Sequence, residues 1–264
     1  MAEINAAMVK ALREETQQSM MECKKALIEA NGDVEEAKLI LRKKGLASAE
    51  KKADRTINEG LVAIEVAADG KSAAMVQVQC ETDFCARNEI FKAAVAQVAK
   101  MAMQAPAGAI AATDAIKDAV QAAQAKIGEN MGYAQGIKVQ ADQVGTYLHH
   151  NSKVGVVVAI TGSIDAATLS DVCMHIAFTN PMGVTKDDIP ADLVEKEKAF
   201  AKEQAIESGK PADIAEKMVV GKINKFLAEN ALLEQPFVRD EKKKVKEVLG
   251  KATITTFARF GIGK

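Results

Sequence analysis

The residues of this chain that are best suited to chemistry or binding stand together in the run Glu81-Thr82-Asp83-Phe84-Cys85-Ala86-Arg87, which we call the corner segment. It follows a stretch, 72–80, in which apolar and more polar residues alternate with the period of two expected for a β-strand. After it, apolar residues recur at helical spacing from Phe91 to about residue 103. The corner segment is therefore predicted to turn the chain from a strand into a helix.

Two interpretations of this turn are open. Thr82 or Asp83 could cap the helix by accepting a hydrogen bond from its first free N–H groups, which leaves Phe84 in or beside the first turn. In one interpretation Phe84 is a core residue and Asp83 only a cap; in the other, an aromatic ring beside an acid protrudes to bind a partner. Cys85, next to Phe84, is expected to be exposed and oxidisable.

The histidines and cysteines offer little further chemistry. His149 and His150 follow a predicted strand, where adjacent side chains point to opposite faces, so we expect one surface contact and no shared ligand. His175 falls within a predicted helix and is expected to be packed or solvated. The cysteines include no C-x-x-C pair and no histidine at zinc-finger spacing. Phosphate-loop, dinucleotide-binding and hydrolase motifs are also absent, which argues against an enzyme and against a cofactor or metal.

Composition limits the class of protein. The chain has 264 residues, 48% hydrophobic and 27% charged, with few aromatic residues and no tryptophan, which favours a helix-rich α+β protein. A formal net charge of −1 gives no field that would attract a phosphate backbone, so no direct nucleic-acid partner is expected. No apolar stretch reaches membrane-spanning length and Met1-Ala2-Glu3 does not open a leader, so we expect no membrane partner and a cytoplasmic protein.

Cap residues predict a three-helix N-terminal domain with its linker at residues 1–55. Ser19 with Glu22, and Asp33 with Glu36, have the spacing of capping boxes that open the second and third helices. Gly45 is predicted to end the third helix, and polar residues from 46 to 59 suggest a domain boundary.

The core is predicted to consist of two β-β-α-type subdomains with antiparallel sheets, whose helices pack on one face of a sheet. The first, residues 56–142, contains a hairpin with a type I′ turn at Asp69-Gly70, followed by the corner segment. The second, residues 143–186 and 231–264, repeats the order strand, turn, strand, helix and ends in a β-like stretch, 253–260, that rejoins its sheet. An alanine-rich helix, about 113–127, lies between the two.

Residues 187–230 are predicted to form an inserted antiparallel coiled-coil hairpin, with helices at about 191–208 and 211–229 joined at Gly209-Lys210-Pro211. Its exposed apolar stripe could pair two copies of the chain as a homodimer. The side chains expected between the two helices are Leu193, Val194, Phe200 and Ile206 against Ile214, Met218, Ile223 and Phe226.

Several motifs together resemble the bacterial elongation factor Ts family. The N-terminal run 12–33 resembles its first signature, and Thr82-Asp83-Phe84 resembles its second. Further agreement covers nearly the whole chain: Lys126-Ile127-Gly128-Glu129-Asn130, Ser208-Gly209-Lys210-Pro211 with Ile214-Ala215-Glu216-Lys217-Met218, and Gln235-Pro236-Phe237-Val238.

The resemblance implies a guanine-nucleotide exchange factor for the GTPase elongation factor Tu, which would bind the GDP-bound and nucleotide-free GTPase and bind no nucleotide itself. It also implies a ubiquitin-associated-like fold for the N-terminal domain. Carried over from the family, Asp83 and Phe84, flanked by Thr82 and Cys85, push into the nucleotide domain and disturb the Mg²⁺ and phosphate site. Contacts with the GTPase are also implied for Met20, Met21 and Lys24 in the first domain, where the alternative is that the two methionines pack into their own core and that Lys24 is a solvated charge. His149 on the second subdomain is implied to meet another domain of the GTPase, with His149 and His150 not distinguished.

The sequence departs from the family at Cys85, where valine is usual, at Gln79, where asparagine is common, and in a short tail after Phe260. Two other functions compete with exchange. An adaptor that binds through its three-helix domain would have no need of the Thr82-Asp83-Phe84 wedge, and an enzyme that used His149 or Cys85 would turn over a substrate.

Overall fold

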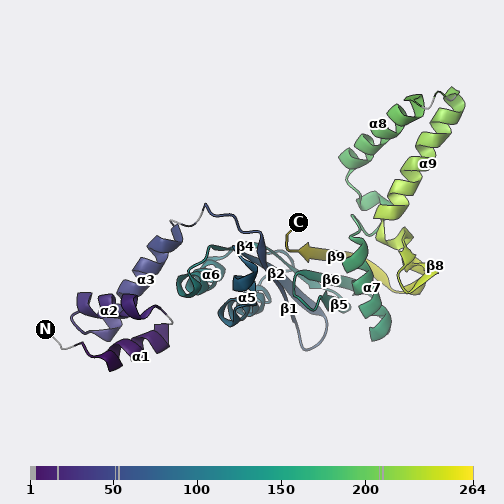
Figure 1. Cartoon of the computed structure of the whole chain (residues 1–264). Helices are drawn as coiled ribbons and strands as arrows, with labels where there is room; N and C mark the ends of the chain where they lie inside the picture. The colour runs from purple at the N-terminus through teal and green to yellow at the C-terminus, as the bar shows by residue number, and fades with distance from the viewer. Residues whose placement is uncertain are drawn as a thin grey trace.

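The computed structural model describes residues 4–16, 18–50, 52, 54–207, 209 and 211–263. Along the chain, three helices lead into a core of two sheets, and a pair of long helices projects from the far end of that core (Figure 1). The residues named above that lie outside the described part are Met1, Ala2, Glu3, Ser208 and Lys210.

The first three helices are α1 (Ala6–Thr16), α2 (Met20–Glu29) and α3 (Val34–Glu50). The predicted starts of α2 and α3 are confirmed, because Ser19 Oγ accepts from the Glu22 N–H at 3.2 Å and Asp33 Oδ1 from the Glu36 N–H at 3.0 Å. Their apolar faces enclose a small core of their own that includes Leu12, Cys23 and Leu27.

The prediction that Gly45 ends the third helix is wrong, since α3 continues to Glu50. Gly45 instead lets α3 approach helix α6 (Asp114–Ile127) closely: a Cβ at this position would lie 3.0 Å from the Ala125 Cβ. Gln18 adds to the contact by donating to the Ala125 carbonyl at 2.6 Å. The glycine therefore serves packing between helices and not a helix end.

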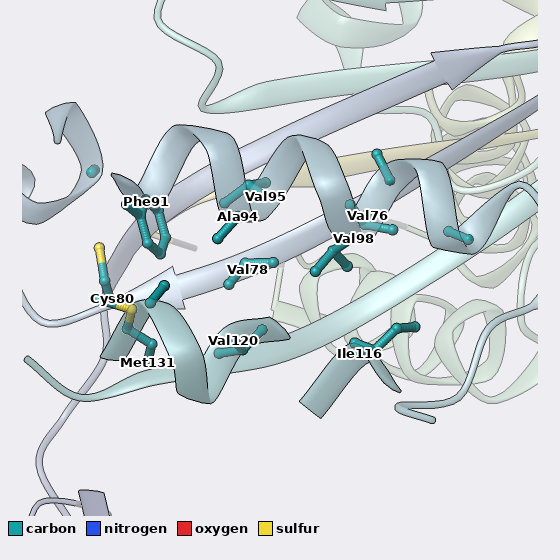
Figure 2. Close-up of a cluster of buried hydrophobic side chains, with 14 of the residues drawn as sticks. Val76, Val78, Cys80, Phe91, Ala94, Val95, Val98, Ile116, Val120 and Met131 are labelled. Atoms are coloured by element: carbon teal, nitrogen blue, oxygen red, sulfur yellow. The ribbon is translucent and has the colours of Figure 1, made fainter. Parts of the chain in front are cut away.

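The first sheet has the antiparallel order β1-β2-β4-β3, with its helices on one face. Helix α5 (Glu89–Ala102) and α6 cover that face and pack Phe91, Val95 and Val120 onto Val76 and Val78 (Figure 2). The strands are β1 (Glu59–Val66), β2 (Ser72–Cys80), β3 (Gly108–Ala109) and β4 (Met131–Gln140). Strand β2 has the predicted bounds, whereas β4 was not predicted.

The turn between β1 and β2 is not the predicted type I′ turn, which would need a positive φ at both central residues. Only Gly70, at φ 67°, has one, and the Gly70 N–H donates to the Ala67 carbonyl at 2.9 Å. The loop runs over residues 67–71, so Asp69-Gly70 marks the hairpin correctly but not its turn type.

The second sheet has the antiparallel order β5-β6-β9, which confirms that the C-terminal strand rejoins it. Helix α7 (Ala166–Thr179) covers one face, together with the short elements that follow the projecting helices. The strands and short elements are β5 (Gln143–Leu148), β6 (Val154–Thr161), β9 (Thr253–Gly261), β7 (Pro236–Phe237), β8 (Asp240–Lys244), α10 (Val245–Val248) and the 3₁₀ turns Lys186–Asp188 and Leu232–Glu234.

The two sheets stack on each other through the faces that their helices leave open. Val62 and Met75 from the first sheet share a core with Val157 and Phe260 from the second. A Cβ at Gly155 would lie 2.5 Å from Val62 Cγ1, so the sheets pack closely there. The expectation of antiparallel sheets with helices on one face is thus confirmed. The sequence did not predict that the two sheets stack between two helical layers, which buries β2 on both faces.

The projecting helices are α8 (Ala191–Glu207) and α9 (Ala212–Asn230), which pack side by side (Figure 1). Small residues fill the space between them, with Ala201, Ala205 and Val219 buried. Phe200, Ile206 and Ile214, predicted to lie inside, are exposed instead. Phe200 and Ile206 each stand next to a buried alanine of α8, so they point about 100° away from the face that packs on α9. Within the described part of the chain, none of the helices combines the length and apolar character needed to cross a membrane.

Candidate functional site

Strand β2 ends at Cys80, and the corner segment forms helix α4 (Asp83–Arg87), a single short helix of its own. Thr82 caps it, since Thr82 Oγ1 accepts from the Cys85 N–H at 3.1 Å. Asn88 is extended (ψ 134°) and caps α5 through the Ile90 N–H at 2.8 Å. The expected direct passage from the turn into the long helix is therefore interrupted by a bend at Asn88.

Helix α4 presents Phe84 to the outside, where the side chain is 79% exposed. This rules out the core interpretation of Phe84. Asp83 pairs with Arg87 one turn later, at 2.9 Å, on the outer side of the same helix. Cys85 is 2% exposed, so the expectation of an exposed, oxidisable thiol is wrong: Cys85 and Ala86 anchor α4 to the first core.

The Cys85 thiol lies next to that of Cys80, and both cysteines are free. A hydrogen bond with Cys85, reinforced by burial, raises the pKa of the Cys80 thiol far above its ordinary value. Cys80 Sγ also donates to the Thr82 carbonyl at 3.3 Å. Both side chains are buried and pack under the turn as two small apolar residues.

The loop between α6 and β4 supports the corner segment. The Glu129 carboxylate accepts from the Thr82 N–H at 3.1 Å and from its hydroxyl at 2.9 Å. Glu81 accepts from the Asn130 N–H at 2.6 Å, and Asn130 donates its side-chain amide to the Arg55 carbonyl at 2.9 Å. Glu129 and Asn130 were noticed in the sequence only through the family resemblance, because Thr82 and Glu81 lie 47 and 49 residues away from them and leave no local signal.

A groove of about 550 Å³ separates α4 from the turn that follows β5, and it is lined by Asp83, Arg87, Lys92, His150 and Lys153. The prediction that the two histidines point apart is wrong: their ring centroids are 4.2 Å apart. Both residues lie beyond the end of β5, so the alternation of a strand does not apply to them. His149 Nδ1 forms a hydrogen bond with the Tyr147 hydroxyl at 2.8 Å, while His150 is the one that lines the groove.

The other predicted contact residues lie in the three-helix unit. Met20, Met21 and Lys24 are all exposed on α2, separate in the fold from α4. The structure thus groups His150 with Asp83 at one groove and leaves the α2 residues on a surface of their own.

No metal site emerges from the residues that the structure describes, where no group of three histidine, cysteine or acidic side chains could hold an ion. His175 is fully buried, and its Nε2 lies 2.8 Å from the Gln235 side-chain oxygen. Its other nitrogen accepts from the Val238 N–H at 3.3 Å, so this histidine joins α7 to the residues on both sides of β7. The expectation of a packed histidine is confirmed.

Comparison with known proteins agrees with this arrangement of elements. A family model described as elongation factor TS matches residues 81–264, which include the corner segment, strands β3 and β4 of the first sheet, the whole second sheet and the projecting helices. The chain belongs to the elongation factor Ts family. An elongation factor Ts of Hahella chejuensis is 44% identical over 268 residues, which cover 100% of this chain and 93% of the relative. That of Photorhabdus laumondii is 44% identical over 267 residues, covering 100% and 94% of the two chains, and that of Teredinibacter turnerae is 44% identical over 267 residues.

The elongation factor Ts relatives also align with the three N-terminal helices, which lie outside the residues that the family model matches. The family match begins at Glu81, the first residue of the corner segment.

Proposed function

We propose that this protein acts in translation elongation as a guanine-nucleotide exchange factor for elongation factor Tu. It promotes GDP release by displacing Mg²⁺ and disturbing the phosphate site, and GTP then rebinds. The observation that carries the proposal is the ring of Phe84, 79% exposed on a helix whose other face is anchored in the core. An aromatic side chain held in that way can enter a partner's pocket at little cost in ordering.

The mechanism follows from how a GTPase holds its nucleotide. Phosphate-loop N–H groups and a Mg²⁺ ion supply most of the contacts, and these depend strongly on geometry. Phe84 and Asp83, with Thr82 and Cys85 holding them in place, enter the nucleotide domain and shift those groups, so GDP leaves faster. The protein performs no covalent chemistry and needs no cofactor of its own.

Thermodynamic linkage between nucleotide binding and exchange-factor binding makes the exchange cycle reversible. GDP and the exchange factor weaken each other's binding to the GTPase by the same factor, so incoming GTP helps to release the factor in turn. The protein binds elongation factor Tu both with GDP and without nucleotide, and it acts in the cytoplasm without contacting nucleic acid or membrane.

Other parts of the chain enlarge the contact. Met20, Met21 and Lys24 on α2 contact the same GTPase, and His149, beside His150 at the groove, meets another of its domains. The chain divides into a ubiquitin-associated-like domain with its linker (1–55), two core subdomains (56–142, and 143–186 with 231–264) and a coiled-coil hairpin (187–230). The hairpin exposes Phe200, Ile206 and Val220, through which two copies could pair.

The test is stopped-flow release of a fluorescent GDP from elongation factor Tu, with and without this protein and its Phe84→Ala variant. Acceleration by the wild type that the variant lacks supports the proposal. If neither protein accelerates release although the wild type binds the GTPase, the chain is an adaptor and the exchange mechanism is wrong.

A further inference from the structure

Few interactions within helix α4 itself fix its orientation. It has five residues, a length at which an isolated helix is unstable in water, and Phe84 makes almost no contact with the rest of the chain. Cys85 and Ala86 anchor one face, and the cap at Thr82 holds the first turn, which contains Phe84. A residue that fixes Thr82 therefore helps to set the direction of Phe84.

Glu129 is the residue that fixes Thr82. A hydroxyl group has one proton to donate, and that of Thr82 points to the Glu129 carboxylate, 2.9 Å and 3.0 Å from its two oxygens. The lone pairs of the same hydroxyl then face the Cys85 N–H at 3.1 Å, which is the bond that starts α4. Glu129 also accepts from the Thr82 N–H at 3.1 Å. The backbone N–H and the hydroxyl of Thr82 therefore both donate to the same carboxylate.

The loop that carries Glu129 is itself held at three points. The Gly128 carbonyl accepts from Lys52 Nζ, Glu81 accepts from the Asn130 N–H, and the Asn130 side chain reaches the Arg55 carbonyl. The corner segment and the loop are thus joined twice, through Glu81 with Asn130 and through Thr82 with Glu129. The carboxylate is a fixed support and not a mobile surface charge.

We propose that Glu129 is a positioning residue for nucleotide exchange, which acts through Thr82 to set the direction of Phe84. The inference rests on the proposed exchange function. Glu129 does not need to touch the GTPase, because its action is complete once α4 is aligned.

The test is a double-mutant cycle of Glu129→Gln and Thr82→Val, measured as GDP release from elongation factor Tu at saturating exchange factor. Glutamine removes the charge of the carboxylate and replaces one of its two acceptor oxygens by an NH₂ donor, so the bonds from Thr82 lose their charge assistance. We expect release to slow roughly tenfold, the effect of one charge-assisted bond. The double variant should be no slower than Thr82→Val alone. Thr82→Ser keeps the hydroxyl and should retain the wild-type rate.

Asp114→Asn on α6 is the matched control, since it removes the same charge from a side chain that is 97% exposed. The inference is overturned if Glu129→Gln lowers the melting temperature while leaving the saturated rate unchanged, or if the two variants act additively. Amide hydrogen exchange at Cys85 separates the inference from the function: Glu129→Gln should speed it even if the wild type proves not to release GDP.

Discussion

Phe84 and Cys85 are adjacent in the chain, yet the side chain of Phe84 is 79% exposed and that of Cys85 is 2% exposed. A helix turns about 100° per residue, so neighbouring positions can serve opposite surfaces. Here Phe84 presents its aromatic ring to the outside, and Cys85, the next residue, anchors α4 in the core. Binding and stability should therefore be separable by substitutions one residue apart.

Phe84→Ala should leave the melting temperature close to that of the wild type and weaken exchange by about 2 kcal/mol, roughly thirtyfold. The ring contributes little to the core but would fill a pocket on the partner. Phe178→Ala is the matched control, because Phe178 on α7 is 81% exposed. Equal loss of exchange in both variants would contradict a specific role for Phe84, and a large fall in melting temperature would show that the ring is needed for folding.

Asp83→Asn should slow exchange with almost no cost in stability. Its ion pair with Arg87 is exposed, and such pairs contribute about 0–1 kcal/mol. The cap is Thr82, so the cost of about 1 kcal/mol expected for losing a cap belongs to Thr82→Val instead. Arg87→Gln breaks the same pair and serves as control: exchange as slow as in Asp83→Asn would mean that the pair matters and not the carboxylate.

The thiols of Cys80 and Cys85 should resist alkylation by iodoacetamide at pH 8 in the folded protein. Both are buried, and the pKa of Cys80 is raised, so neither supplies an accessible thiolate. Mass spectrometry should find both modified only after denaturant is added. Rapid labelling of Cys85 without denaturant would show that α4 opens in solution.

The pH dependence of stability should be carried in part by His175. Burial lowers the pKa of this histidine below its ordinary value, with the hydrogen bond to Gln235 opposing the shift. Above about pH 6.5 the histidine is neutral in both states. As the pH falls below that value, the unfolded chain takes up a proton that the folded chain does not, so stability falls until the folded pKa is reached.

Thermal melts between pH 5 and pH 8, values that bracket the ordinary histidine pKa, should thus show a shallower decline for His175→Gln than for the wild type, whatever its stability at pH 8. His150→Gln removes an exposed histidine and should keep the wild-type slope. An unchanged slope in His175→Gln would mean that other groups govern the acid response.

Local sequence patterns predicted individual helices and strands well. They did not predict the contacts between residues that are far apart in the sequence. The bounds of strand β2 are predicted correctly because apolar and more polar residues alternate along the strand itself. Strand β4 was missed because Gly132, Gln135 and Gly136 interrupt any apolar alternation, and its place is set by pairing with β2. The exposed ring of Phe84 could be proposed from the turn and the family resemblance, whereas its support by Glu129 depends on a residue far along the chain.

The projecting helices show a second limit of prediction from sequence, which concerns the residues that are buried between them. Large apolar residues were assigned to their interior because hydrophobic side chains are usually buried. The face of α8 that packs on α9 carries Ala201 and Ala205 instead, so burial here follows the rotation of the helix and not the hydrophobicity of single residues.

Gly155→Ala tests the stacking of the two sheets on which the site depends. The added Cβ would lie 2.5 Å from Val62 Cγ1 and 2.9 Å from Met75 Sδ, so the sheets must move apart, and overpacking of this kind costs about 1–3 kcal/mol. Gly221→Ala, in α9 with nothing within 4 Å, should instead stabilise by about 0.5–1 kcal/mol, because alanine favours helix. Val62→Ala combined with Gly155→Ala makes room for the new methyl group and should recover part of the loss in urea unfolding. If Gly155→Ala is neutral and the double variant is simply additive, the sheets do not meet at this glycine.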